Sequence, residues 1–420
     1  MNIKELYKIY KKHPIICTDS RKIIEKGIFF ALKGKNFDGN KFAQSAISQG
    51  CSYAIVDDKQ FIDNKNTRII LVQDVLETLQ LLAMQHRQNI NIPVIAITGS
   101  NGKTTSKELI HTVLASEYSC CATIGNLNNH IGVPLSLLKI KDSDKLAIIE
   151  MGANSIGEIS KLCDIAQPNY GVITNIGKAH LEGFVNLEGV VRAKSELYKY
   201  IKKNNGSIFI NNDDELLLKK SDGIKKYTYG ITGDYTGKIS KTTPFINVLY
   251  ADKEISTNLI GEYQYQNIML AICIGDFFNI RIDNIKKAIE SYTPKNNRSQ
   301  IINTEKNTII LDAYNANPTS MNAMLSSFAK QDYNNKLCII GDMLEMGESS
   351  LKEHQEIINL ITRLKLDTYT IGKEFSKINK HSFVDVEEFI TFLKNNPFKN
   401  KTILLKGSRS ISLEKMVEFL

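Results

Sequence analysis

The sequence contains no tryptophan, only eight prolines, and seven cysteines spread over 420 residues. No two cysteines have the C-x-x-C spacing of a zinc site or redox motif, and two of them are simply neighbours. We therefore expect reduced thiols in a cytoplasmic chain rather than a disulfide framework. The cysteines are Cys17, Cys51, Cys120, Cys121, Cys163, Cys273 and Cys338.

Long hydrophobic runs are also missing. No apolar stretch approaches the roughly 18 residues of a membrane-spanning helix. The charged, amphipathic start, MNIKELYKIYKKH, lacks the apolar core and cleavage site of a signal peptide. With 42% hydrophobic and 23% charged residues, the composition is that of an ordinary globular protein. We expect a cytoplasmic protein without stable membrane insertion.

The chain has no dense block of lysine and arginine with interleaved aromatic residues, so nucleic-acid binding is not expected. Its net charge of +8 suits anionic substrates. Lysine, isoleucine and asparagine are abundant throughout the sequence, however, so much of this charge reflects a general compositional bias.

Short apolar runs alternate with stretches of helical periodicity through most of the chain. This pattern predicts an α/β protein with buried, mainly parallel strands. Segment 230–260 departs from it and is a candidate for antiparallel strands. The runs are GIFFAL (27–32), YAIV (53–56), RIILV (68–72), VIAIT (94–98), LAIIEM (146–151), YGVITNI (170–176), SIFI (207–210), TIILDAY (308–314), KLCIIGDM (336–343) and TILLKGS (402–408).

Two polar breaks divide this pattern. QNINIP precedes a strand-like run at residue 94, and TPKNNRSQ, residues 293–300, separates a helical stretch from a new strand. They predict three segments, 1–92, 93–297 and 298–420. No internal repeat of solenoid period is present.

The stretch ITGSNGKTTSKELI predicts a phosphate-binding turn between a strand and a helix. Gly99 and Gly102 allow the backbone to approach an anion closely. Lys103 would reach the β- and γ-phosphates, and the Thr104 hydroxyl would ligate Mg²⁺. The string is shorter than the general P-loop, because Ile97 stands where that motif has its first glycine. A plain glycine turn is the alternative, which the flanking strand and helix disfavour.

Three further residues are candidates for the same site. Glu150 ends a buried strand, where a carboxylate can hold the Mg²⁺ that bridges nucleotide phosphates; the alternative is a capping or ion-paired glutamate. His180 follows another strand in a glycine-containing loop and is either a site residue or a structural histidine. Lys194 lies in a helical stretch, VRAKSELY, where its sequence context alone indicates an exposed lysine.

These strings together resemble the Mur ligase family, the ATP-dependent ligases that form the amide bonds of peptidoglycan precursors. The resemblance covers nearly the whole chain. The similar segments are TDSR (18–21), FFALKGKNFDGNKF (29–42), GSNGKTT (99–105), GNLNNHIGVPLSLL (125–138), EMGANSIGEI (150–159), NIGKAHLEGF (175–184), DAYNANPTSM (312–321), GDMLEMG (341–347) and KGSR (406–409).

Within the family, DAYNANP and GANSIGEI are the most discriminating strings, and they look like the member that joins D-Ala-D-Ala to UDP-MurNAc-tripeptide. The D-Y-A-H-T-P and D-N-P-R patterns of the member that adds the third amino acid are absent. The resemblance implies an N-terminal UDP-sugar-binding domain (1–92), a central ATP-binding P-loop domain (93–297), and a C-terminal Rossmann-like domain (298–420) that closes on ATP and the incoming dipeptide. The sequence does not fix the oligomeric state, and a monomer is the simplest expectation. It implies ATP and Mg²⁺ as cofactors and an acyl-phosphate intermediate.

The resemblance also implies roles for individual residues. It assigns catalysis to Lys103, His180 and Lys194. It assigns magnesium binding to Thr104, Glu150, His180 and Lys194, the last as a carbamate, which replaces a positive charge by a negative one with two oxygens suited to Mg²⁺. The nucleotide-binding residues are Gly99, Ser100, Asn101, Gly102, Lys103, Thr104, Thr105, Asn267, Arg298, Asp312 and Asn315. The substrate-binding residues are Ser20, Arg21, Asn154, Lys406, Ser408 and Arg409.

The sequence departs from the family pattern at two places. In GEYQYQN, Tyr263 and Gln264 stand where the family often has His and Asn near the adenine, although Gln264 still offers an amide. The family's D-G-H near the start is D-G-N here, with Asn40, which affects a uridine-side contact. The first alternative is another ligase of the superfamily, either the enzyme that adds the third stem residue or one like folylpolyglutamate synthase. The others are a P-loop switch without ligase chemistry and an inactive ligase-like scaffold.

Overall fold

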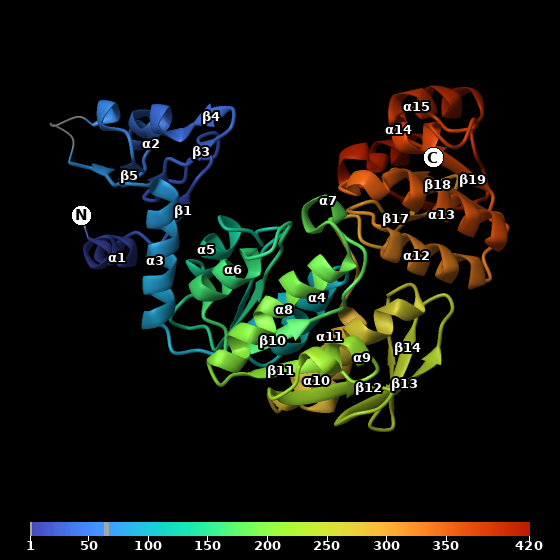
Figure 1. Ribbon diagram of the computed structural model, residues 1–420, viewed down its shortest axis with the longest axis horizontal. Coiled ribbons are helices and arrows are strands. Elements are labelled where there is room, and N and C mark those ends of the chain that lie inside the picture. The colour runs from blue at the N-terminus through green and yellow to red at the C-terminus, as the bar shows by residue number, and fades with distance from the viewer. Residues whose placement is uncertain (1, 63–66) are drawn as a thin grey trace.

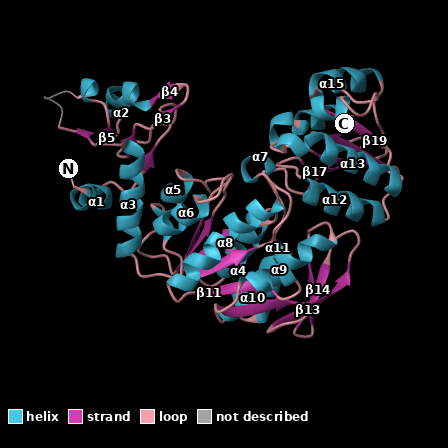
Figure 2. Cartoon of the chain, viewed as in Figure 1, coloured by secondary structure: helices cyan, strands magenta, loops and turns pink. Residues whose placement is uncertain are grey.

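A computed structural model of the protein describes residues 2–62 and 67–420, which form three α/β units (Figure 1). The units follow one another from the blue N-terminal unit through the green and yellow central unit to the orange and red C-terminal unit. Strands and helices alternate through most of the chain (Figure 2). The predicted α/β class with three units is confirmed, and every apolar run named above contains a strand. The segment boundaries at residues 92 and 297 stay predictions.

The N-terminal unit is built on a parallel sheet with the strand order β1-β2-β5-β6. A short antiparallel ribbon, β3 with β4, extends from it. The strands are β1 (Ile16–Cys17), β2 (Ile28–Phe30), β3 (Lys33–Gly34), β4 (Phe37–Asp38), β5 (Tyr53–Val56) and β6 (Ile69–Leu71). The helices are α1 (Ile3–Lys12), α2 (Ala43–Ser48) and α3 (Val75–Asn89).

Helix α3 connects the N-terminal unit to the central one (Figure 1). Its buried residues Leu79, Leu82 and Ala83 belong to one hydrophobic cluster that includes side chains of both units. Helix α1 packs beside it, and the Tyr10 hydroxyl donates a 2.6 Å hydrogen bond to the Leu138 carbonyl of the central unit. The two units therefore share a continuous core around α3.

Arg87, near the end of α3, is 8% exposed, and its guanidinium binds the chain segments that lead into the central sheet. Such a side chain satisfies several carbonyls at once, and removing it leaves them buried without partners. Its nitrogens donate to the carbonyls of Ile90, Ala166 and Gln167 and to the Asn169 Oδ1, at 3.0–3.1 Å.

We expect the substitution Arg87→Met to lower the free energy of unfolding by about 3 kcal/mol, because the hydrogen bonds of the guanidinium are lost while the desolvation cost of burying its charge, which offsets most of their contribution, is also removed. Thermal denaturation should show a lower midpoint. Turnover at moderate temperature should stay normal, since Arg87 lies at the edge of the sheet where the strands begin. Arg363→Met, at an exposed helical position, is the control. A midpoint as high as that of the control would contradict this account of Arg87.

The central unit has a sheet with the strand order β15-β14-β13-β12-β11-β10-β7-β9-β8. Neighbouring strands are parallel from β8 across to β13. The pairs β13/β14 and β14/β15 are antiparallel, which confirms the prediction for segment 230–260. The strands are β7 (Val94–Thr98), β8 (Cys120–Ala122), β9 (Leu146–Glu150), β10 (Tyr170–Ile173), β11 (Ser207–Asn211), β12 (Lys225–Gly230), β13 (Tyr235–Lys241), β14 (Asn247–Tyr250) and β15 (Lys253–Ser256).

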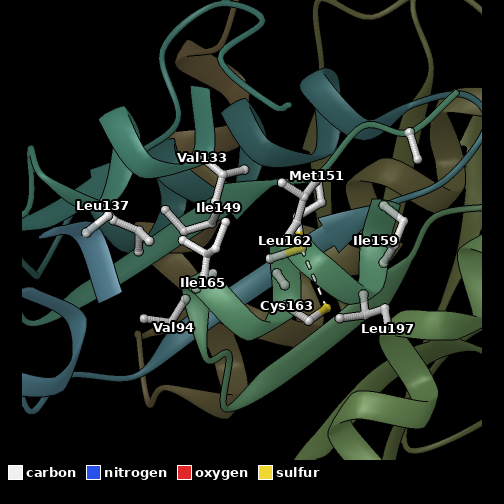
Figure 3. Close-up of a cluster of buried hydrophobic side chains, with 14 of the residues drawn as sticks. Val94, Val133, Leu137, Ile149, Met151, Ile159, Leu162, Cys163, Ile165 and Leu197 are labelled. Atoms are coloured by element: carbon white, nitrogen blue, oxygen red, sulfur yellow. Dashed lines mark hydrogen bonds between the residues drawn. The ribbon is translucent and has the colours of Figure 1, made fainter. Parts of the chain in front are cut away.

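Helices cover both faces of this sheet, as the continuous apolar strands β7 and β9 require. Figure 3 shows one face, where Val133 and Leu137 of α5 and Leu162 of α6 pack on Ile149 of β9. Helices α4, α10 and α11 cover the other face. The helices of this unit are α4 (Lys103–Leu114), α5 (Gly132–Leu137), α6 (Glu158–Ala166), α7 (Leu181–Phe184), α8 (Leu187–Lys203), α9 (Glu215–Lys220), α10 (Tyr265–Phe277) and α11 (Ile282–Ser291).

The C-terminal unit has the strand order β16-β17-β20-β18-β19, parallel except for the pair β16 and β17. Hydrophobic clusters on both faces give it the doubly wound, Rossmann-like arrangement predicted from the sequence. The strands are β16 (Gln300–Asn303), β17 (Thr308–Asp312), β18 (Lys336–Gly341), β19 (Thr368–Ile371) and β20 (Thr402–Lys406). The helices are α12 (Pro318–Lys330), α13 (Ser350–Leu364), α14 (Lys373–Ser376) and α15 (Val386–Asn395).

Among the described residues, no helix combines the length and the apolar character that crossing a membrane requires. The seven cysteines are free thiols, most of them buried. Burial raises the pKa of the Cys51 and Cys121 thiols to about 11.

Candidate active site between the central and C-terminal units

The predicted phosphate loop lies where β7 ends and α4 begins. Gly99 has φ +147° and Gly102 has φ +79°, conformations that favour glycine. A Cβ atom on Gly99 would lie 2.0 Å from the Thr174 hydroxyl, and one on Gly102 would lie 2.7 Å from the Asn267 Oδ1. Both glycines are therefore required by conformation and by close contact. The free backbone N–H groups at the start of α4 make this loop suited to an anion.

Lys103 begins α4, and its ammonium folds back over the loop. Its Nζ donates to the Gly99 carbonyl at 2.7 Å. Burial lowers the pKa of Lys103, and the Glu150 carboxylate partly opposes this shift. Ser100 is buried and bonded to Gly177, whose N–H donates to the Ser100 Oγ at 2.9 Å. The loop thus holds its cation close to the position of a bound phosphate.

Glu150 lies beside this loop at the carboxyl end of β9 and is 1% exposed. The Thr104 hydroxyl donates to its Oε2 at 3.0 Å, and the Asn128 amide donates to its Oε1 at 2.8 Å. The buried Nζ of Lys107 lies 3.9 Å from the same Oε2. Sequence reasoning missed Lys107, although it stands four residues after Lys103 and hence on the same face of α4.

The paired oxygens of Thr104 and Glu150 fit Mg²⁺, which prefers hydroxyl, carboxylate and phosphate oxygens. Within residues 2–62 and 67–420, no three His, Cys, Asp or Glu side chains gather closely enough to hold a metal ion by themselves. A magnesium ion at Thr104 and Glu150 would therefore also take ligands from nucleotide phosphates and water, as is usual for this ion.

His180 stands at the contact between the central and C-terminal units. It precedes α7 with φ +53°, and its Nδ1 pairs with the Glu345 carboxylate from the C-terminal unit. The hydrogen bond from His180 lowers the pKa of Glu345. The Glu182 N–H also donates to the Glu345 carbonyl at 3.0 Å. The sequence showed the loop GDMLEMG but gave no reason to select Glu345.

Lys194 is 1% exposed, so the sequence-based expectation of a surface lysine is wrong. Helix α8 places it on the apolar face with Val190 and Leu197, under Phe184, whose ring centre lies 5.5 Å from its Nζ. Burial lowers the pKa of Lys194 to about 7, the Lys103 ammonium adds to this effect, and carboxylates nearby oppose it. The neutral amine is therefore well populated near neutral pH.

The predicted C-terminal residues meet at the ends of β17 and β20. The Lys406 Nζ, on a 2% exposed residue, donates to the Asp312 Oδ2 at 2.6 Å. The Arg298 guanidinium stacks on Tyr314 at 3.7 Å from the ring centre, and the Arg409 guanidinium lies 5.1 Å from the same ring. Tyr314, which sequence reasoning did not select, therefore organises both arginines.

Two further residues of this group differ in accessibility. Asn315 is exposed, and its Oδ1 accepts from the following N–H at 2.9 Å. Ser408 is 3% exposed, and its Oγ accepts from the Leu344 N–H at 2.9 Å. Ser408 thus holds the loop that carries Glu345.

The residues that depart from the family pattern form an internal network. Asn267 donates to the Gln264 Oε1 at 2.7 Å and accepts from the Ser106 hydroxyl at 2.9 Å. Gln264 thus supports Asn267, beside Gly102. Tyr263 packs toward the C-terminal unit, where its hydroxyl lies 3.2 Å from the Ser299 Oγ. Neither replacement disrupts the phosphate loop.

Two predicted substrate residues, Ser20 and Arg21, belong to the N-terminal unit, whereas Asn154 follows β9 in the central unit, four residues after Glu150. Arg21 is exposed and binds Asp19 through two hydrogen bonds of 2.9 Å, which lower the pKa of Asp19 to about 2. Ser20 adjoins it and is half-buried, and Asn154 is exposed. Asn40 is 0% exposed, and its side-chain amide is hydrogen-bonded within its own unit, to the carboxylates of Asp38 and Asp57 and to the Asp57 N–H.

Three family models match the chain. The model described as Mur ligase family, catalytic domain, matches residues 13–87. The Mur ligase middle domain matches 97–275, and the Mur ligase, glutamate ligase domain, matches 297–409. The UDP-N-acetylmuramoyl-tripeptide–D-alanyl-D-alanine ligase of Bacillus subtilis (strain 168) is 33% identical over 423 residues, which cover 96% of this chain and 92% of that protein.

Solved structures agree with these matches. A crystal structure of MurF from Acinetobacter baumannii is 31% identical with a TM-score of 0.86, over 96% of this chain and 92% of that one. The structure of MurF ligase from Thermotoga maritima in complex with ADP is 28% identical with a TM-score of 0.83, over 96% of both chains.

Proposed function

Because this chain belongs to the Mur ligase family, we propose that it joins D-alanyl-D-alanine to UDP-N-acetylmuramoyl-tripeptide in an ATP-dependent reaction of peptidoglycan synthesis. One observation carries the proposal. A phosphate loop with Lys103, Thr104 and Glu150 faces a C-terminal unit that contacts the loop directly, in a chain similar over 96% of its length to ligases of this activity. A nucleotide-binding switch needs no such second unit.

The chemistry requires activation, since a carboxylate and an amine do not condense in water at neutral pH. The terminal carboxylate of the tripeptide attacks the γ-phosphorus of ATP, ADP leaves, and an acyl-phosphate forms. The deprotonated amine of D-Ala-D-Ala, whose pKa is about 8, then attacks the acyl carbon. A tetrahedral intermediate collapses to the amide and inorganic phosphate, and the product is UDP-MurNAc-pentapeptide.

The family resemblance supports roles for the chain's own residues. Lys103 offsets the charge that builds on the transferred phosphoryl group. Thr104 and Glu150 would hold Mg²⁺, with His180 and the carbamate of Lys194 as further ligands. The ion would supply positive charge to the phosphate oxygens. Closure of the C-terminal unit excludes water and so protects the acyl-phosphate from hydrolysis.

The other residues are proposed to bind the substrates. Residues 1–92 bind the UDP-sugar through Ser20 and Arg21, residues 93–297 bind ATP, and residues 298–420 close on ATP and the dipeptide. Asn154, Lys406, Ser408 and Arg409 contact the substrates in this proposal, and Asn267, Arg298, Asp312 and Asn315 contact the nucleotide. A cytoplasmic monomer is the proposed state, consistent with a supply of ATP and with free thiols.

The proposal is tested by measuring phosphate release from ATP and Mg²⁺ in the presence of UDP-MurNAc-tripeptide, with and without D-Ala-D-Ala. Tripeptides ending in lysine and in diaminopimelate are both supplied, and mass spectrometry identifies the product. Dipeptide-dependent release together with a UDP-MurNAc-pentapeptide is expected. Release that depends on a single amino acid instead would indicate another ligase of the superfamily. ATP binding without any ligation would indicate a switch or an inactive scaffold.

A further inference from the structure

We propose that Asn317, in the C-terminal unit, is a positioning residue for ATP that acts through Asn101 of the phosphate loop. The inference deepens the proposed function and rests on it. It concerns a pair of side chains 216 residues apart in the sequence that meet across the contact between two units. The C-terminal unit would thereby complete the phosphate loop as well as cover it.

The two asparagines form a reciprocal amide pair. The Asn317 Nδ2 donates to the Asn101 Oδ1 at 2.8 Å, and the Asn101 Nδ2 donates to the Asn317 Oδ1 at 3.3 Å. Asn317 is 4% exposed, so its amide lies between the units rather than in solvent. Such a pair is directional, because each amide must present its oxygen to the other's nitrogen.

The central unit fixes only the backbone of Asn101. Its N–H donates to the Asn175 Oδ1 at 3.0 Å. Its carbonyl accepts from the Thr174 hydroxyl at 2.6 Å and from the Asn175 Nδ2 at 2.9 Å. Among the described residues, the Asn101 side chain exchanges its hydrogen bonds with Asn317 alone, donating one and accepting the other. Within the described structure, the middle of the loop is thus held by two units at once.

The same side chain also fixes the helix that approaches the loop. Asn317 is the N-cap of α12, and its Oδ1 accepts from the Ser320 N–H at 2.9 Å. Asn317 therefore links the start of α12 to the phosphate loop. A change in the orientation of the C-terminal unit would therefore alter the conformation of the phosphate loop, and the reverse also holds.

Further contacts beside the asparagine pair hold the C-terminal unit against the central unit. The Lys178 N–H donates to the Thr319 Oγ1 at 3.1 Å, and the Lys178 Nζ lies 2.6 Å from the Glu353 Oε1. Gly177 permits the approach, because a Cβ atom there would lie 2.7 Å from the Thr319 Oγ1. The first turn of α12 therefore rests on both loops that bound the phosphate position.

The test replaces Asn317 by serine, which remains a good N-cap but is too short to reach Asn101 and adds no charge. We expect Asn317→Ser to weaken ADP binding, measured by titration calorimetry on the full chain, and to raise the KM for ATP about tenfold, the effect of losing two neutral hydrogen bonds. The kcat at saturating ATP should fall much less. Asn101→Ala should have a similar effect.

A double-mutant cycle separates positioning from simple capping. If Asn317 acts through Asn101, the double variant should bind ADP no more weakly than either single variant. Additive losses would overturn the inference. Lys330→Ala is the control, because it removes a 3.3 Å contact with Glu262 between the same two units at the other end of α12. Its ADP affinity should equal that of the unmodified chain.

The outcomes also distinguish this inference from the function on which it rests. Normal ligation together with unchanged ADP affinity in Asn317→Ser would overturn the positioning role and leave the ligase intact. An unmodified chain that neither binds ADP nor ligates would overturn both. A lower denaturation midpoint of Asn317→Ser with unchanged ADP affinity would show that Asn317 acts as a helix cap and not as a positioning residue.

Discussion

Replacing Lys103 with methionine is expected to lower the rate of dipeptide-dependent phosphate release about a thousandfold, the effect of removing one strong electrostatic contact to a reacting group. Methionine keeps most of the length and apolar surface of the lysine stem but removes the charge and the N–H donors. The ammonium bonds to the Gly99 carbonyl, so it already lies over the loop proposed to bind the phosphates.

The fold should survive this change, because a buried cation with a lowered pKa contributes little to stability in the absence of nucleotide. The thermal midpoint of Lys103→Met should therefore stay close to that of the unmodified chain. Lys415→Met, at an exposed ion pair in the C-terminal unit, is the control and should retain full activity. Near-normal turnover by Lys103→Met would contradict the proposed mechanism.

Substitutions of Lys194 distinguish whether its side chain acts as a carbamate or as an unmodified amine. If Lys194 acts as a carbamate, Lys194→Gln should lower activity about a thousandfold, because a neutral amide cannot replace an anionic magnesium ligand. Lys194→Glu should retain more activity than Lys194→Gln, since it supplies a carboxylate at the same helical position. Burial favours the neutral amine, which is the form that reacts with carbon dioxide.

Carbon-13 NMR of the chain incubated with labelled bicarbonate gives an independent measurement. The unmodified protein should show a carbamate resonance that the Lys194→Gln protein lacks. Equal activity of the glutamine and glutamate variants, together with no carbamate resonance, would show that Lys194 is a buried structural amine.

The strands and the phosphate loop could be predicted because they depend on local sequence. Strands covered on both faces must be largely apolar, and β7 and β9 are apolar up to their last residues, Thr98 and Glu150. The same rule placed Glu150 at the end of a strand. The two glycines predicted a tight turn, and the tight turn explains why other atoms lie so close to Gly99 and Gly102.

The burial of Lys194 was predictable in principle. Val190 and Leu197 lie four residues before and three after it, so Lys194 falls on the apolar face of α8. The usual exposure of lysine outweighed this signal. Lys107 similarly shares a helical face with Lys103. In both cases the helical spacing indicated the position of the lysine, whereas the usual exposure of lysine pointed the other way.

Contacts between units were beyond the reach of the sequence. Nothing local links Asn101 to Asn317 or His180 to Glu345, because these pairs depend on how the C-terminal unit rests on the central one. The hydrogen bonding of Asn40 likewise depends on Asp57, which follows β5 and lies 17 residues further along the chain. Sequence patterns report which face of an element is buried, but they do not report against which partner.

The shared core around α3 bears on how this protein can be divided for study. A fragment that starts at residue 93 keeps the whole central sheet but loses Leu79, Leu82 and Ala83, which cover the apolar surfaces of α5 and α6. Uncovered surface of this kind promotes aggregation. A soluble fragment must therefore retain α3, and antibodies or crystallisation partners raised against a shorter piece would recognise a surface that the intact protein hides.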